Sequence, residues 1–60
     1  MNKPTNEKMS EAIKAYGHET VSLVIMIVNL SDPDGAWSLF QDTGNDDAVH
    51  CVEFLYFQLD

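Results

Sequence analysis

The chain has 60 residues, a mass of 6.7 kDa and a formal net charge of −7. A chain this short forms one domain with a small core, and it is too short for an enzyme with a closed active site. Its composition, 45% apolar and 22% charged, is that of a folded protein. The single cysteine, Cys51, excludes an internal disulfide, and no Cys/His cluster supplies four zinc ligands. The class that remains is a small binding module.

Negative charge is distributed unevenly along the chain. All three lysines lie in the first fourteen residues, which together carry a charge of +1, and there is no arginine. Residues 15–60 contain no Lys or Arg and carry the carboxylates of Glu19, Asp32, Asp34, Asp42, Asp46, Asp47, Glu53 and Asp60. A surface of this kind repels nucleic acid and acidic membranes and attracts basic partners. We therefore expect a basic protein partner, with solubility as the alternative explanation of the acidity.

The sequence predicts a cytoplasmic protein. Its longest apolar run, residues 21–30, is about half as long as the roughly 20 residues that span a membrane. No small-residue cleavage site of a signal peptide follows this run. A lone cysteine is compatible with a reducing compartment.

The first predicted element is a helix over residues 5–16, preceded by a flexible tail at 1–4. Its apolar residues recur with the spacing of one helix face: Met9, Ala12, Ile13 and Tyr16. Thr5 or Asn6 can cap the start of this helix, and Gly17 is suited to end it.

Three β-strands are predicted to follow the helix. Residues 20–30 are rich in Val and Ile, whose β-branching favours a strand. Turn-forming sequences at 31–35 and 43–47 separate this strand from predicted strands at 36–42 and 48–59. The prediction is a single α+β domain over residues 1–60, with one N-terminal helix and a three-stranded antiparallel meander.

One helix covers only one face of such a sheet. The other face would carry several large apolar side chains, from Val24, Met26, Val28, Phe40, Val52, Phe54 and Tyr56. This is more contiguous apolar surface than a free monomer normally exposes. We therefore expect a second copy or another partner to cover it, with a homodimer as the simplest arrangement.

Residues capable of metal binding or catalysis do not form a recognisable pattern. His50 and Cys51 would point to opposite faces of the third strand, and no third group is spaced to orient them or His18. The acidic residues at 32, 34, 42, 46 and 47 lack the calcium-loop pattern, so they are expected to be turn residues. Cys51 is expected to be buried, and Trp37 to lie in the core or over a sheet edge. No metal or cofactor is expected.

The start of the first predicted strand offers the most specific functional hypothesis. In a basic cleft, the Glu19 carboxylate can take the place of a phosphate, and the Thr20 hydroxyl can add a hydrogen bond. Val21 would then add a dry apolar contact. The alternative interpretation is an ordinary strand start.

Two segments resemble the uracil-DNA glycosylase inhibitor (Ugi) family of phages. A helix containing Met9–Ile13 leads through Gly17 into Glu19-Thr20-Val21, which is similar to the Glu-Ser-Ile motif of that family. The sequence from Trp37 to Asn45 is similar to the family's Trp-Ala-Leu strand with its Gln-Asp-Ser and glycine turn. Together they cover about a third of the chain. The second, acidic helix and further strands of the family have no counterpart here.

The resemblance implies an acidic DNA mimic, encoded by a phage or mobile element, that inhibits uracil-DNA glycosylase by occupying its DNA-binding groove. Such a protein is not itself an enzyme. Residues 19–21 would enter the groove. An apolar pocket would come from sheet residues such as Leu23, Met26 and Phe40, or from a second subunit. On physical grounds the carboxylates of Asp42, Asp46 and Asp47 can imitate phosphates. The alternative is a small acidic homodimeric module, antitoxin-like or anti-restriction, with no glycosylase partner.

Overall fold

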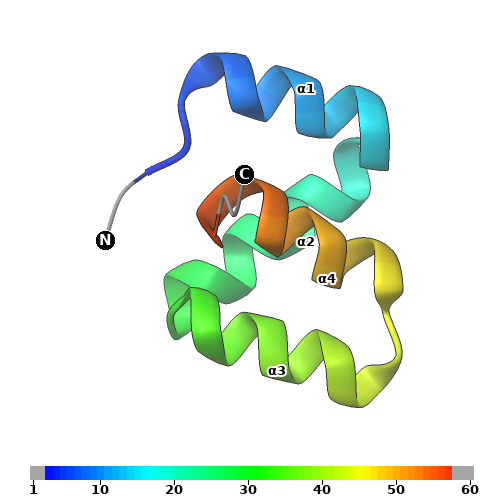
Figure 1. Cartoon of the computed structure of the whole chain (residues 1–60). Coiled ribbons are helices and arrows are strands. Elements are labelled where there is room, and N and C mark those ends of the chain that lie inside the picture. The colour runs from blue at the N-terminus through cyan, green and yellow to red at the C-terminus, as the bar shows by residue number, and fades with distance from the viewer. Residues whose placement is uncertain (1–2, 58–60) are drawn as a thin grey trace.

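The structure, a computed structural model, describes residues 3–57, and all the regular secondary structure in this range is helical (Figure 1). Four α-helices follow one another: α1 (Asn6–Tyr16), α2 (His18–Leu30), α3 (Pro33–Thr43) and α4 (Asp46–Val52). A π-helical segment, η1 (Glu53–Phe57), continues from α4. None of these helices is both long and apolar enough to cross a membrane.

The predicted α+β fold with a three-stranded antiparallel meander is wrong. Residues 20–30 lie in α2, residues 36–42 in α3, and residues 48–57 in α4 and η1. The last two residues of the third predicted strand, 58 and 59, lie outside the described residues, as do residues 1 and 2 of the predicted tail. The helix predicted over residues 5–16 is confirmed as α1. Its cap is Thr5, whose hydroxyl oxygen accepts a hydrogen bond from the Lys8 backbone N–H at 3.1 Å.

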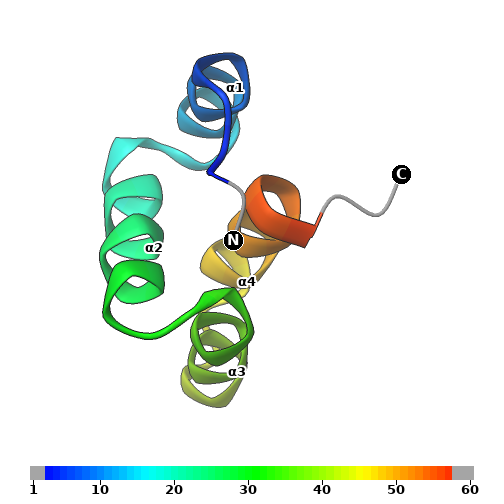
Figure 2. The same ribbon diagram turned by 90° about the vertical axis from the view of Figure 1, so that its left-hand side faces the viewer.

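Helix α2 lies across the other three helices. Figure 2 shows α1, α4 and α3 stacked from top to bottom and viewed roughly end-on, with α2 running along one side of the stack. Helix α4 occupies the middle of this arrangement and packs against each of the other helices. The fold is therefore a layer of three helices with a single helix laid over it.

The core fills the space between α2 and the three-helix layer. Its buried residues are Ala12, Val21, Val24, Val28, Ala36, Phe40, Ala48, Val49, Cys51, Val52 and Leu55. Most are alanine or valine, so each contributes a small apolar area. This is the limited core expected of a chain of this length.

The burial pattern of α2 explains why a segment rich in β-branched residues is helical. Val21, Val24 and Val28 are buried, and their spacing of three and four residues places them on one helix face. As a strand the segment would be apolar on both faces, whereas as a helix it buries one side against α4 and α3. The strand preference of Val and Ile is small enough for such packing to override it.

The two segments predicted as turns contain the starts of α3 and α4. The Asp32 side chain accepts a hydrogen bond from the Gly35 N–H at 2.6 Å, and Pro33 occupies the first turn of α3. The Asn45 side chain accepts one from the Ala48 N–H at 3.2 Å. Asp, Asn and Pro serve helix starts as readily as turns, since both use the same local hydrogen bonds.

Candidate functional site

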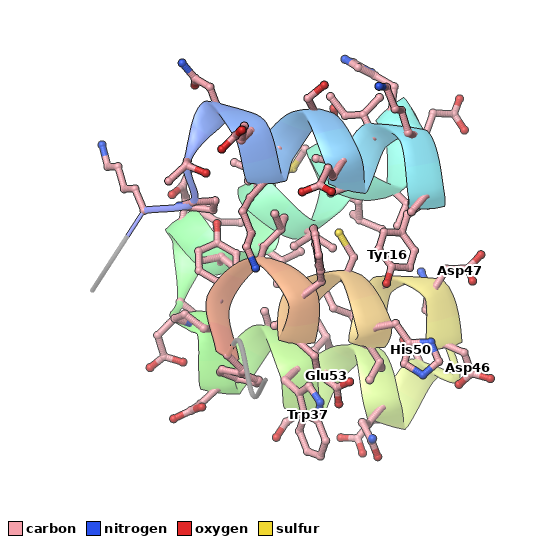
Figure 3. All side chains as sticks on the ribbon, turned by 45° about the horizontal axis from the view of Figure 1, so that its top comes forward. Tyr16, Trp37, Asp46, Asp47, His50 and Glu53 are labelled. Atoms are coloured by element: carbon pink, nitrogen blue, oxygen red, sulfur yellow. The ribbon has the colours of Figure 1, made fainter. Side chains whose placement is uncertain are left out.

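Three exposed carboxylates flank the connection between α3 and α4. Asp42 lies in the last turn of α3, and Asp46 and Asp47 lie in the first turn of α4. We call these three residues the acidic corner. Figure 3 shows Asp46 and Asp47 at one end of the molecule, with His50 beside them on α4. All three were expected from the sequence to face a partner, and the fold gathers them at one connection.

A tight helix-to-helix turn fixes this corner. Gly44 has a φ of 75° and a left-handed conformation, which a glycine adopts without steric cost. The Gly44 N–H donates to the Gln41 carbonyl at 3.1 Å, and the Asn45 N–H donates to the Phe40 carbonyl at 2.9 Å. These two bonds hold the turn to the end of α3, and the Asn45 side chain, which accepts from the Ala48 N–H, holds it to the start of α4. The three carboxylates therefore stand on a defined backbone.

The acidic corner combines favourable and unfavourable helix electrostatics. Asp46 and Asp47 sit at the positive N-terminal end of α4, where negative charge is stabilised. Asp42 sits at the negative C-terminal end of α3, and the last turn of α3 contains no basic residue. A carboxylate at that position opposes the helix dipole by about 0.3–1 kcal/mol. Asp42 therefore lowers the stability of its own helix.

The two halves of the described chain differ in charge. Residues 32–57 contain six carboxylates and no Lys or Arg, whereas residues 3–31 contain three lysines and three glutamates. The Lys8 ammonium lies 4.5 Å from the centroid of the Phe54 ring and 3.4 Å from the Phe54 carbonyl oxygen, so it is engaged with η1. The α3–α4 side of the molecule is thus strongly acidic.

A hydrogen bond between Trp37 of α3 and Glu53 of η1 joins these two elements. The Trp37 indole N–H donates to a Glu53 carboxylate oxygen at 2.9 Å, and both side chains are half-buried (Figure 3). The Trp37 ring packs against the core, in agreement with its predicted place there. This hydrogen bond could not be predicted from the sequence, because it depends on how two helices pack.

The reactive side chains near the corner are held in their neutral forms. Burial raises the pKa of the Cys51 thiol to about 11, and the side chain is fully buried. Burial, followed by the charges of Cys51, Asp47 and Glu53, raises the pKa of Tyr16 above its ordinary value. An activated nucleophile needs the opposite shift. Within residues 3–57, no three His, Cys, Asp or Glu side chains are placed to hold a metal ion.

The predicted groove-entering segment is not extended. Glu19, Thr20 and Val21 lie in the first turn of α2, so their side chains point in three different directions around the helix. Glu19 is exposed, Thr20 is half-buried and Val21 is only 3% exposed. These three residues therefore do not present one continuous edge to a partner.

The residues expected to line an apolar pocket are also separated. Leu23 and Met26 are exposed on α2, whereas Phe40 is in the core and only 3% exposed. Of the predicted sheet face, Val24, Val28 and Val52 are fully buried as well. The expectation that this apolar face needs a partner to cover it is therefore wrong for most of its members, since the helical fold buries them itself.

Comparisons with known proteins do not assign this chain to a family. No protein-family model matches the sequence, and no curated protein or solved structure has significant similarity to it. The resemblance to the Ugi family stays a prediction. It now concerns two segments that are helical here, since residues 19–21 lie in α2 and residues 37–43 in α3.

Proposed function

We propose that this protein is a non-catalytic binding module that uses its α3–α4 side, and the acidic corner above all, to occupy the basic DNA-binding surface of another protein. The observation that carries this proposal is the complete lack of Lys and Arg after residue 14, combined with the gathering of exposed carboxylates at one fixed corner. Carboxylates on a rigid backbone can take the positions of phosphates and accept the same hydrogen bonds.

The position of Asp42 supports a functional origin of the acidity. If the carboxylates served solubility alone, they could lie anywhere on the surface without loss. Asp42 instead occupies a helix end at which negative charge is unfavourable. Residues that break a local rule without a local gain are expected at functional sites.

Uracil-DNA glycosylase is the first partner that we propose, on the strength of the sequence resemblance. In the helical fold its DNA-binding groove would receive the acidic corner and not an extended strand. The compartment that we propose is the cytoplasm, where a reduced cysteine such as Cys51 is stable. A small acidic regulatory module without a glycosylase partner is the alternative.

An inhibition assay tests the proposal. Uracil excision by the glycosylase is measured with and without the protein, next to a panel of other enzymes with basic DNA-binding grooves. We expect inhibition of at least one enzyme, weakened by rising salt because the contacts are between charges. The triple variant Asp42→Asn, Asp46→Asn, Asp47→Asn should weaken the inhibition by at least about tenfold, since charge-assisted hydrogen bonds contribute about 1.5–3 kcal/mol each.

A second variant removes a carboxylate outside the acidic corner. Glu19 is exposed in the first turn of α2, so Glu19→Gln should change the inhibition little. A large loss for Glu19→Gln, with no loss for the triple variant, would restore the groove-entering hypothesis for residues 19–21. No inhibition of any enzyme in the panel would favour the regulatory module.

A further inference from the structure

The outer face of α2 carries three large apolar side chains that no part of residues 3–57 covers. Leu23 is 36% exposed, Met26 56% and Leu30 78%. Their spacing of three and four residues places them on one side of α2, away from the buried Val21, Val24 and Val28. We call Leu23, Met26 and Leu30 the α2 stripe. Figure 2 shows that the side of α2 turned away from α4 has no other helix against it.

A groove between α1 and α2 extends this apolar surface. Its volume is about 470 Å³, and its walls include Met9 and Ile13 of α1 and Ile25 and Met26 of α2. Ile13 is 38% exposed at this position. Methionine side chains adapt their shape to an incoming apolar group. His18, Ser22 and Asn29 of α2 add polar groups to the groove wall. Met26 belongs to both the groove and the α2 stripe, so the two surfaces adjoin.

The low net charge on the α2 side of the molecule indicates what kind of partner can bind there. Residues 3–31 carry equal numbers of Lys and Glu, and the only Lys, Arg, Asp or Glu in α2 is Glu19. A strongly basic partner finds its complement on the α3–α4 side and not here. Two copies of this chain repel each other through their α3–α4 sides, but their neutral α2 sides can approach without such repulsion.

The spacing of the α2 stripe suits pairing of one helix with another. Leu23, Met26 and Leu30 repeat as the inward-facing positions of a coiled-coil heptad do. A two-fold axis would place the same stripe on both sides of the contact, so a single apolar patch is enough to form it. A standard interface covers about 800 Å² on each partner. This is roughly a fifth of the 4160 Å² surface of the molecule, or about one of its sides.

We propose that a second copy of the chain covers the α2 stripe, in a two-fold symmetric dimer in which the two α2 helices pack against each other. This surface differs from the sheet face considered from the sequence, with which it shares only Met26. The proposal does not depend on what the acidic corner binds.

Sedimentation equilibrium of the full chain tests this proposal. The expected result is a monomer of 6.7 kDa at low concentration and a dimer at about 100 μM, with a dissociation constant between about 1 and 100 μM. Higher salt should leave the dimer intact or strengthen it, because it screens repulsion between two acidic copies. Met26→Lys should raise the dissociation constant at least about tenfold. That variant also reduces the net negative charge, so its effect cannot come from added repulsion between acidic chains.

Leu39→Lys is the matched control. Leu39 is an exposed apolar residue of α3, 46% exposed against 56% for Met26, and the substitution changes the charge equally. It should leave the dissociation constant within about threefold, and circular dichroism should show both variants folded. A wild-type chain that stays monomeric at about 100 μM overturns the proposal. So does a dimer that Met26→Lys leaves intact, or one that both substitutions weaken equally.

Discussion

The buried Cys51 side chain affects the free energy of unfolding at alkaline pH. Burial raises the pKa of its thiol from 9.0 to about 11 in the folded protein. In the unfolded chain the thiol loses its proton near its ordinary pKa, and the thiolate then favours unfolding. The free energy of unfolding should therefore be constant up to about pH 9 and fall as the pH rises toward about 11. Tyr16 and Tyr56, whose pKa values burial also raises, add to the decrease at the upper end.

Urea unfolding of the wild-type chain and of Cys51→Ala measures this contribution. We expect Cys51→Ala to be less stable at neutral pH because it leaves a small cavity. Its free energy of unfolding should nevertheless decline less between about pH 9 and about pH 10 than that of the wild type. Identical slopes for the two proteins would show that the thiol is not protected by the core. A thiol reagent that modifies folded Cys51 at neutral pH would contradict the account in the same way.

At the scale of single residues, sequence reasoning succeeded where a side chain's own chemistry decides its position. Cys51 was expected to be buried, and it is. Asp42, Asp46 and Asp47 were expected to be turn residues; they are exposed, but they lie in the last turn of α3 and the first turn of α4. Val21 and Phe40 were expected to face a partner and are buried instead. Their exposure depends on which side of a helix faces α4, which no local property of the residue reveals.

At the scale of elements, the sequence predicted α1 and missed the other helices for identifiable reasons. The α1 segment has an amphipathic stripe with clear start and stop signals, so its pattern fits a helix alone. The α2 segment is apolar almost all round, and such a run fits a buried helix as well as a strand. The predicted strand over residues 20–30 was already longer than most strands, and that length favours a helix. Asp32 and Asn45, interpreted as turn residues, cap α3 and α4.

The start of α3 can be tested by removing its cap. Asp32→Ala leaves the Gly35 N–H without its side-chain partner, so the free energy of unfolding should fall by about 1 kcal/mol. Asp34→Ala removes an equal charge from the first turn of α3 without touching the cap. It should change the stability by less than about 0.5 kcal/mol, because the higher helix propensity of Ala offsets the lost interaction with the helix dipole. Thermal unfolding followed by circular dichroism compares the two. Equal losses would mean that residues 32–35 do not cap a helix.

Opposite effects are expected at the two sides of the acidic corner. Asp42→Asn should stabilise the protein by about 0.3–1 kcal/mol, since it removes a negative charge from the C-terminal end of α3. Asp46→Asn should destabilise it by a similar amount, since it removes one from the N-terminal end of α4. Unfolding at low ionic strength, where these interactions are least screened, measures both. A change of the same sign in both variants would contradict the helix assignment at this connection.

At the scale of the whole molecule, the sequence alone predicted the uneven distribution of charge but not the arrangement of the helices. Counting Lys, Arg, Asp and Glu along the chain is enough to separate a balanced first half from an acidic second half. The helical fold converts that difference along the chain into two different sides. The acidic corner lies at the connection between α3 and α4, and the α2 stripe lies on the exposed face of α2. The two surfaces are therefore free to act independently.

The central claim, that the acidic corner binds a basic protein surface, is tested most directly by an amide chemical-shift titration. The isotope-labelled chain is titrated with uracil-DNA glycosylase, or with the enzyme of the panel that it inhibits most strongly. We expect the largest shifts to cluster between Asp42 and His50, and competing DNA or high salt to reverse them. Shifts confined to α1 and α2, or no shifts in the presence of any of these enzymes, would contradict it.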